Sequence, residues 1–365
     1  MVKIPQNIQE LKSYNPGKSI EQIIEDYGLK ETAILWNNEN NFGASPMAQE
    51  EIAKAAAATC VYPDPLSLEL RDLIAKENNC AVNQVVVGNG SEAIMSNMFK
   101  AFCASGDEVL TSEGTFVAIY IWAKSSNIPC VKVPLNKSYG FDCVAIVNSI
   151  TAATKIIYIA NPNNPTGTIL SAEDIHSLMS RVPEEIVVVI DEAYIEYAVA
   201  IDADFPDTST MDYPNLLTFR TFSKAYGIAG ARIGYAIGAP ELIEALNKVR
   251  LTFAPSNIAQ AAGIGAIKDK AFLEKTIRNN TDEIKAYYEF FDALNVNYVP
   301  SYGNFVMIAL DAPEQATRLF QHLLERGVFV RVLTAFGLAH CVRITIGTPE
   351  DNQLFFKIFR EVYKS

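Results

Sequence analysis

The sequence predicts an α/β fold in which a large domain, with a mostly parallel sheet between helices, is joined to a smaller α+β domain. Through the middle of the chain, short apolar runs alternate with helical patterns, as strands and crossover helices do in a parallel sheet. The run Ile186–Ile190 is entirely β-branched, which is typical of a strand buried on both faces. Beyond residue 295 the expected strands are few and their order is mixed. We therefore expect a large domain at residues 46–255 and a small domain formed by residues 1–45 and 256–365.

The expected elements alternate along most of the chain. A helix over 20–27 and a weak strand over 33–36 precede helices over 46–58 and 67–77. A strand over 84–87 leads through a glycine-rich turn into a helix over 93–103. Further strands are expected over 108–111, 129–133, 156–160, 186–190 and 216–222, and the region from 241 to 294 is largely helical. Strands over 298–310, 328–332 and 341–346, with helices over 313–325 and 352–363, complete the chain.

Composition bounds the class of protein. With 365 residues, 49% of them hydrophobic and 20% charged, the chain is an ordinary globular sequence that is long for one core. Its net charge of −12 argues against nucleic acid as a main partner, because phosphate backbones attract basic surfaces. Six cysteines are scattered without metal-binding spacing, so we expect reduced thiols, no metal site and a cytoplasmic location. No secretory signal and no membrane span are expected.

Two polar stretches leave alternatives open. The stretch Gly88–Glu92 follows a predicted strand and opens a helix, so the backbone N–H groups near Gly90, Ser91 and Glu92 and the helix dipole suit an anion. Its spacing matches neither the dinucleotide G-x-G-x-x-G nor the P-loop, and it is either a small phosphate site or a tight turn. The amide-rich loop Asn37–Gly43 is either a turn that bonds its own backbone or the lining of a polar pocket.

Three polar side chains follow three predicted strands. Asn164 comes after the strand over 156–160, Asp191 after the strand over 186–190 and Lys224 after the strand over 216–222. The separations are 191 − 164 = 27 and 224 − 191 = 33 residues, each about one βαβ unit. Because ligands of such sheets bind at the carboxyl ends of the strands, we expect an amide, a carboxylate and an amine to converge there.

Lys224 alone has two interpretations. One is an ordinary lysine in a surface loop. The other is an amine that bonds a phosphorylated carbonyl compound, because hydroxyls of Thr221 and Ser223 and the cation of Arg232 are near in sequence, and a second cation favours the neutral amine. The expected convergence with Asp191 favours the second interpretation.

A pyridine aldehyde phosphate suits these residues. Lys224 would form a Schiff base with the aldehyde and then act as base at the substrate α-carbon, while Asp191 would hold a proton on the ring nitrogen. We expect Asn164 and Tyr194 at the ring hydroxyl and Phe116 on the ring face. The phosphate would be bound by Gly90, Ser91, Glu92, Ser223 and Arg232.

These motifs resemble those of the fold-type I pyridoxal-phosphate aminotransferases. The resemblance is carried by Asn163-Asn164-Pro165-Thr166-Gly167, Asp191-Glu192-Ala193-Tyr194 and Ser223-Lys224-Ala225, followed by Ala229-Gly230 and Arg232. The closest branch is histidinol-phosphate aminotransferase, whose motif order is matched by Tyr14–Lys18, Asn38–Asn40, Tyr62-Pro63, Gly88–Glu92 and Arg343–Thr348. This resemblance covers essentially the whole chain. It implies pyridoxal 5'-phosphate as cofactor and amino-group transfer between histidinol phosphate and 2-oxoglutarate in histidine biosynthesis.

The resemblance also implies partners and a substrate side. The enzyme would be a homodimer in which Tyr62 reaches the cofactor phosphate of the other subunit. Arg343 would bind the carboxylate of glutamate or 2-oxoglutarate, and Arg331 the phosphate or carboxylate of the substrate. The substrate side would be completed by Tyr14, Asn40 and Gly43. The expected small-molecule partners are therefore an amino donor and a 2-oxo acid.

The sequence departs from this branch at several positions. Asn41 replaces a usual proline, Phe116 replaces a usual tyrosine, and the segments 251–257 and 339–341 differ from the usual pattern. Two departures lie near the expected substrate pocket, so an aromatic or other L-amino acid aminotransferase is an alternative, and a pyridoxal-phosphate decarboxylase a more distant one. A cofactor-binding regulatory domain is a non-enzymatic alternative, but neither spare length nor a basic face exists for its nucleic-acid module.

Overall fold

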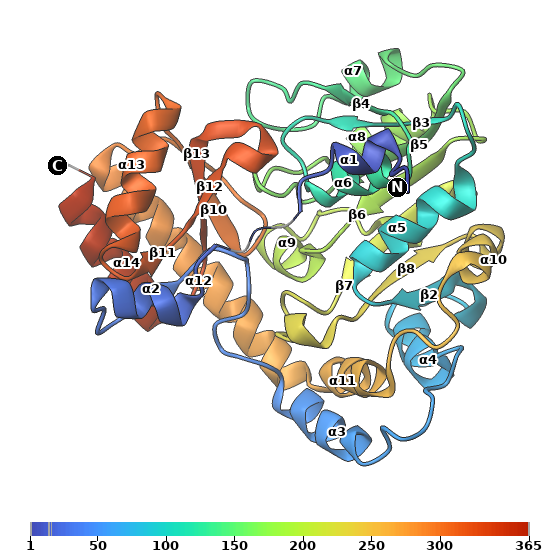
Figure 1. Cartoon of the computed structure of the whole chain (residues 1–365), viewed down its shortest axis with the longest axis horizontal. Helices are drawn as coiled ribbons and strands as arrows, with labels where there is room; N and C mark the ends of the chain where they lie inside the picture. Colours follow the sequence, from blue (N-terminus) through green and yellow to red (C-terminus); the bar gives the residue numbers. More distant parts are fainter. Residues whose placement is uncertain (1, 14, 16, 364–365) are drawn as a thin grey trace.

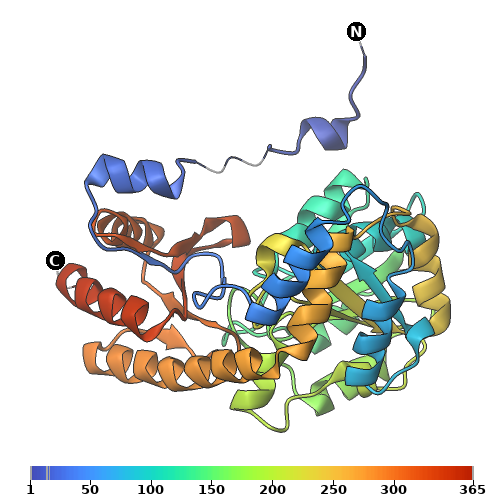
Figure 2. The same ribbon diagram turned by 90° about the horizontal axis from the view of Figure 1, so that it is seen from below.

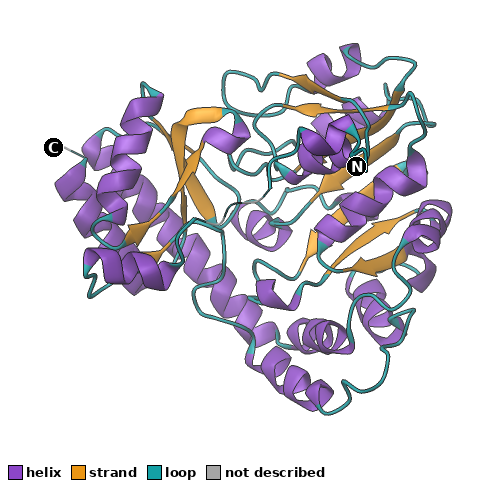
Figure 3. Cartoon of the chain, in the orientation of Figure 1, coloured by secondary structure: helices purple, strands orange, loops and turns teal. Residues whose placement is uncertain are grey.

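A computed structural model describes residues 2–13, 15 and 17–363, and Figure 1 shows their arrangement. A seven-stranded sheet forms the larger part of the molecule, and a four-stranded sheet with its own helices forms the smaller part. In Figure 3 helices lie on both faces of the large sheet. The fold is therefore α/β with a mostly parallel sheet, as the sequence predicts.

The large sheet has the strand order β2-β8-β7-β6-β5-β3-β4. β8 is antiparallel to β2 and β7, while the pairs from β7 across to β4 are parallel. The carboxyl ends of β5, β6 and β7 therefore meet at one edge. The strands are β2 (Val85–Gly88), β3 (Glu108–Ser112), β4 (Cys130–Val133), β5 (Thr154–Ala160), β6 (Val187–Asp191), β7 (Leu216–Thr221) and β8 (Gly234–Gly238).

Helices bury both faces of this sheet. One face carries α5 (Ser91–Phe102), α6 (Ala118–Ser125) and α10 (Pro240–Val249). The other carries α4 (Leu68–Glu77), α7 (Cys143–Asn148), α8 (Ala172–Met179) and α11 (Asn257–Lys268), with α3 (Pro46–Ala56) packed on α11. Alternate residues of β5 join the two cores, Tyr158 and Ala160 on the first face and Ile157 and Ile159 on the second. Such double-sided burial explains why the strands read as continuous apolar runs.

The smaller sheet is antiparallel, in the order β12-β13-β10-β9. Its strands are β9 (Tyr298–Val299), β10 (Phe305–Ala309), β12 (Arg331–Leu333) and β13 (Leu338–Thr345). The helices α12 (Lys270–Leu294), α13 (Pro313–Leu324) and α14 (Pro349–Val362) enclose an aromatic core that includes Tyr287, Phe291 and Phe355. β1 (Ala33–Ile34) pairs in parallel with β11 (Val328–Phe329), so the N-terminal part of the chain joins this unit.

The helix α12 and the N-terminal segment both link the two parts. α12 runs from beside α11 to the small sheet, as Figures 1 and 2 show, and contacts α9 (Ile195–Ile201) of the large part. At the N-terminus, α1 (Gln6–Gln9) lies against α6, where Asn7 Nδ2 donates to the carbonyl of Lys124 at 3.0 Å. α2 (Ile20–Tyr27), capped by Ser19, follows on the side of the small sheet. The domain boundaries at residues 45 and 255 stay a prediction.

Most expected elements are present, with several differences. α1 was not predicted, and the single strand expected over 328–332 is divided into β11 and β12, which belong to different sheets. β8 was not predicted, because Gly234 and Gly238 bound a run of only three other residues. The expected helical region over 241–294 is divided into α10, α11 and α12, because Ser256 and Asp269 each cap a new helix by accepting a backbone N–H.

Among the described residues, no helix is both long and apolar enough to cross a membrane. The same residues contain no group of His, Cys, Asp and Glu side chains that could hold a metal ion.

Candidate active site

A cavity of about 190 Å³ opens at the carboxyl ends of β5, β6 and β7, beside the start of α5. Apart from Tyr62, every residue predicted to contact the cofactor lines it. The lining residues are Asn37, Glu39, Gly90, Ser91, Glu92, Phe116, Tyr158, Ala160, Pro162, Asn164, Asp191, Ala193, Tyr194, Thr221, Ser223, Lys224, Ala229 and Arg232.

Lys224 supplies the amine of this cavity. Its Nζ donates to the backbone carbonyl of Asn37 at 3.1 Å, and its side chain is partly buried. Burial, together with the charges of Arg343 and Arg232, lowers the pKa of Lys224 to about 8, although Glu39 opposes the shift. Roughly a tenth of such an amine is neutral at pH 7, so it is a far better nucleophile than an ordinary lysine.

Asp191 is a buried carboxylate at the end of β6, only 4% exposed. Its Oδ2 accepts from the hydroxyl of Tyr158 at 2.8 Å, and its Oδ1 accepts from the N–H of Ala193 at 3.2 Å. Burial raises the pKa of Asp191 to about 6, although the hydrogen bond from Tyr158 favours ionisation. Among the described residues no cation forms an ion pair with it within 4.0 Å. The carboxylate can therefore accept a cationic group from the cavity.

Two further polar side chains line the cavity. The Oδ1 of Asn164 accepts from Nη1 of Arg343 at 2.5 Å, and the hydroxyl of Tyr194 accepts from Nδ2 of Asn38 at 2.8 Å. Both donors come from outside the large sheet, since Arg343 lies on β13 and Asn38 lies in the loop after β1. Burial raises the pKa of Tyr194, so its phenol is protonated at neutral pH.

Arg343 is a guanidinium that is only 5% exposed. Besides Asn164, its Nη2 donates to the carbonyl of Trp36 at 2.8 Å, while its buried Nε has no partner among the described residues. No described carboxylate forms an ion pair with it. Burial lowers the pKa of Arg343 to about 10, and the charge of Arg331, its neighbour across β12 and β13, acts in the same direction. A buried cation without a carboxylate is suited to an incoming anion.

The start of α5 forms an anion cup. Gly90 precedes the helix with φ of 76°, and a Cβ there would lie 2.7 Å from Nη2 of Arg232, so glycine allows the guanidinium to approach. The hydroxyl of Ser223, which lines the same cavity, accepts from that of Thr221 at 3.0 Å. Glu92 lies 4.0 Å from Arg232. Backbone N–H groups at a helix start, a cation and a hydroxyl thus line the same cavity, and such a set suits a phosphate.

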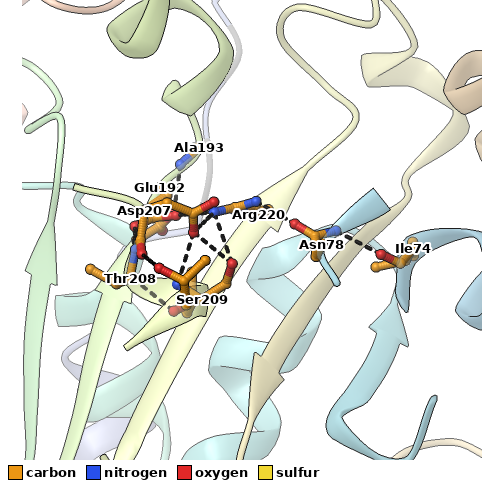
Figure 4. A network of polar contacts seen from close by, with 11 residues as sticks. Ile74, Asn78, Glu192, Ala193, Asp207, Thr208, Ser209 and Arg220 are labelled. Carbon is orange, nitrogen blue, oxygen red and sulfur yellow. Dashed lines mark hydrogen bonds and ion pairs between the residues drawn. The ribbon is translucent and has the colours of Figure 1, made fainter. Parts of the chain in front are cut away.

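A buried ion pair supports the ends of β6 and β7 (Figure 4). Arg220 donates through Nε and Nη2 to Glu192 at 3.0 and 2.7 Å, and it also contacts Asp207. Glu192 directly follows Asp191, and Arg220 lies on β7 shortly before Lys224. The pair therefore fixes the two cavity strands relative to each other.

The predicted residues outside the cavity wall are Tyr62 and those of the substrate side. Tyr62 is 77% exposed. Asn40 donates to the carbonyl of Ala225, next to Lys224, but neither Asn40 nor Gly43 lines the cavity. Tyr14 lies outside the described residues. The roles given to these residues stay predictions.

Several cavity residues were missed by sequence reasoning. The register of the sheet sets Ala160 beside Asp191, so Tyr158, two positions earlier on the same face, directs its hydroxyl to the carboxylate. Because side chains of a strand alternate between its two faces, the position of Tyr158 two residues before Ala160 could have indicated its place in the cavity. Asn37 and Glu39 line the cavity, so the amide-rich loop is a pocket lining as well as a turn.

The site combines a lysine amine, a buried carboxylate and an anion cup at the carboxyl edge of a parallel sheet, as expected of an α/β enzyme that works through a bound cofactor. The sequence model of the family described as aminotransferase class I and II matches residues 33–358. The chain belongs to this family.

Relatives match the chain over nearly its whole length. It is 37% identical to histidinol-phosphate aminotransferase 2 of Pasteurella multocida (strain Pm70), covering 98% of each chain. It is 35% identical to histidinol-phosphate aminotransferase of Geobacillus sp. (strain WCH70), covering 100% of this chain and 99% of the relative. The crystal structure of histidinol-phosphate aminotransferase from Sinorhizobium meliloti in complex with pyridoxal-5'-phosphate matches with a TM-score of 0.90 at 27% identity, over 100% and 98% of the two chains. The expected fold, reaction class and cofactor are therefore confirmed, and the protein is a pyridoxal-phosphate-dependent aminotransferase.

Proposed function

We propose that this enzyme transfers the amino group of histidinol phosphate to 2-oxoglutarate in histidine biosynthesis. Similarity over the whole chain to proteins named histidinol-phosphate aminotransferase supports the amino donor. The observation that carries the proposal is Arg343, a buried guanidinium that touches a cavity residue and forms no ion pair with a described carboxylate. A dicarboxylic oxo acid or a phosphorylated amine supplies the anion that it lacks.

The residues of the cavity fit pyridoxal 5'-phosphate. When bound, this cofactor supplies an electron-withdrawing ring that stabilises charge on the carbon bearing the transferred amine. Asp191 would hold the protonated ring nitrogen, and this contact would give the buried carboxylate the cation that it lacks. Phe116 would lie on the ring face. The phosphate would be held by Gly90, Ser91, Glu92, Ser223 and Arg232.

Lys224 carries the covalent and proton-transfer roles in this proposal. Its amine would bond the cofactor aldehyde, and after the substrate amine replaces it, the freed amine would move a proton from the substrate α-carbon to the cofactor carbon. A pKa near 8 suits both roles, because the amine can lose and regain a proton near neutral pH. Tyr194 and Asn164 would hydrogen-bond the ring hydroxyl.

The substrate side is assigned to two arginines and three smaller contacts. Arg343 would bind the carboxylate of glutamate or 2-oxoglutarate, and Arg331, beside it on β12, the phosphate or carboxylate of the substrate. Asn40, Gly43 and Tyr14 would complete this side.

We further propose a cytoplasmic homodimer. The exposed Tyr62 stacks on Phe253, with 4.3 Å between ring centroids, and Val61 and Leu251 beside them are also exposed. Such an apolar patch suits contact with a second subunit. Tyr62 would then reach the cofactor phosphate of that subunit.

A second candidate is an aromatic or other L-amino acid aminotransferase, favoured by Phe116 on the cavity wall. The departure at Asn41 bears on this alternative less, because Asn41 donates to Asp351 at 2.8 Å and does not line the cavity.

The two functions are distinguished by comparing amino donors. With 2-oxoglutarate as the amino acceptor, turnover is measured for histidinol phosphate, phenylalanine, tyrosine and aspartate. We expect the phosphate ester to have the highest kcat/KM. Equal values would refute this donor but not aminotransfer, whereas release of carbon dioxide without a need for oxo acid would identify a decarboxylase.

A further inference from the structure

The cavity side chain Tyr194 contacts Asn38, which sequence reasoning did not single out as a site residue. Asn38 is 1% exposed, and its Nδ2 lies 2.8 Å from the hydroxyl of Tyr194. Its backbone is left-handed, with φ of 55°, a conformation that asparagine, aspartate and glycine tolerate better than other residues. The carbonyl of Asn38 accepts from Asn304, and its N–H donates to the hydroxyl of Thr345. The residue is therefore held at both its backbone and its side chain.

The two ends of the Asn38 amide have different partners, Thr345 and Tyr194. The Thr345 oxygen accepts from the backbone N–H of Asn38 at 2.9 Å, since an N–H can only donate. The hydroxyl proton of Thr345 is then free to donate to the Asn38 side chain at 3.2 Å, and the atom that receives it is Oδ1. The amide nitrogen, a donor, faces the phenol oxygen of Tyr194 at 2.8 Å.

This polarity decides where the proton of Tyr194 points. Because Nδ2 of Asn38 donates to the phenol oxygen, the phenol proton is not used in that contact and is free to be donated elsewhere. Tyr194 is 2% exposed and lines the cavity, so the direction open to its proton is the cavity. We propose that Asn38 is a positioning residue, which holds Tyr194 as a hydrogen-bond donor to the ring oxygen of the bound cofactor. This inference rests on the proposed place of Tyr194 at that oxygen.

The second cavity amide is oriented in the same way. Arg343 has only donors, so the atom of Asn164 that it contacts must be the oxygen, and the NH₂ group of Asn164 is the end left for a ligand. Arg343 and Thr345 lie two residues apart on β13 and share one face of that strand. One strand of the small sheet thus orients both predicted partners of the ring oxygen as donors, an arrangement that favours the oxygen's anionic form.

The test is the pH midpoint at which the absorbance of the bound cofactor changes, because that midpoint depends on how well the ring oxygen is stabilised as an anion. Asn38→Asp replaces the donor by an acceptor of the same shape, so the phenol would donate to it and be withdrawn from the cofactor. Asn38→Gly removes the side chain without straining the left-handed backbone. Loss of one such hydrogen bond should raise the midpoint by about half to one pH unit, as Tyr194→Phe should.

Combined variants separate orientation from charge. In the Tyr194→Phe background, Asn38→Asp should shift the midpoint much less than in the wild type, because there is no phenol proton left to redirect. Thr345→Val should raise the midpoint and Thr345→Ser, which keeps the hydroxyl, should not. Asn41→Ala is the matched control, since this amide of the same loop bonds Asp351. The thermal midpoint of each variant reports its folding.

The outcomes are distinct. An unchanged midpoint in both Asn38 variants, with a raised one in Tyr194→Phe, would overturn this inference and leave the proposed function intact. A full shift by Asn38→Asp in the Tyr194→Phe background would do the same, because it would show that charge alone acts. If the wild type bound no cofactor through Lys224, the proposed function would fail and this inference with it.

Discussion

Replacing Asp191 by asparagine should stabilise the cofactor-free protein. The same replacement should abolish the activity of the protein loaded with cofactor. The pKa of this carboxyl is about 6 in the folded chain against an ordinary value of 3.8, because burial penalises its charge. The folded state therefore binds the proton more tightly than the unfolded state, so stability falls as pH rises from about 4 to 6 and stays low above that. At pH 8 the charged carboxylate lowers the free energy of unfolding by (6 − 3.8) × 1.36, which is about 3 kcal/mol.

The variant Asp191→Asn removes this charge but not the whole contact. An amide has one oxygen to accept with, so one of the bonds from Tyr158 and Ala193 is lost, at a cost of about 1 kcal/mol. The net gain at pH 8 is therefore about 2 kcal/mol. Since roughly half of the charge penalty is already present at pH 5, the advantage of the variant should be about 1.4 kcal/mol smaller there.

The assay is guanidinium unfolding of cofactor-free wild type and variant at pH 5 and pH 8, with the difference in stability compared between the two conditions. A difference that does not change with pH would refute the raised pKa. A wild type more stable than the variant at pH 8 would show that the carboxylate has a cation partner in the empty site.

Incorporation of pyridoxal into the cofactor-free protein should be half-maximal near pH 8, where Lys224 titrates. Arg343→Gln should raise that pH midpoint by about one unit, because the variant loses a cation that disfavours the charged form of Lys224. A lower midpoint in the variant would contradict this. Arg220→Met should cost about 3–5 kcal/mol in chemical unfolding by leaving Glu192 buried and unpaired, and a loss below 1 kcal/mol would count against the ion pair. Tyr62→Ala should weaken cofactor affinity, and mixing it with Lys224→Ala subunits should restore one working site per dimer; no recovery would argue against a shared site.

The features that the sequence predicts best are those set by strand periodicity. Asn164, Asp191 and Lys224 follow strands buried on both faces, and such strands are recognisable as apolar runs one βαβ unit apart. Once the sheet is parallel, its carboxyl ends must meet, so convergence of these three residues follows from chain topology. The turn at Gly90 is similarly readable as a strand-turn-helix sequence, although that pattern alone leaves both a small phosphate site and a tight turn open.

The features that the sequence does not reveal depend on contacts between distant segments. The amide of Asn38 joins Tyr194 in the large part of the molecule to Thr345 on β13, and no local pattern carries that information. The ion pair of Arg220 and Glu192 likewise joins residues whose partnership requires the register of β6 and β7. β8 was missed because its antiparallel place between β2 and β7 depends on pairing, not on a long apolar run.

The lysine that bonds the cofactor can be identified directly by trapping the bond. The protein loaded with pyridoxal 5'-phosphate would be reduced with borohydride, digested, and its peptides sequenced by mass spectrometry. We expect the cofactor on Lys224 and on no other lysine at stoichiometric yield, with no label and no turnover in Lys224→Ala. Stoichiometric label on another lysine, or turnover by Lys224→Ala, would contradict it.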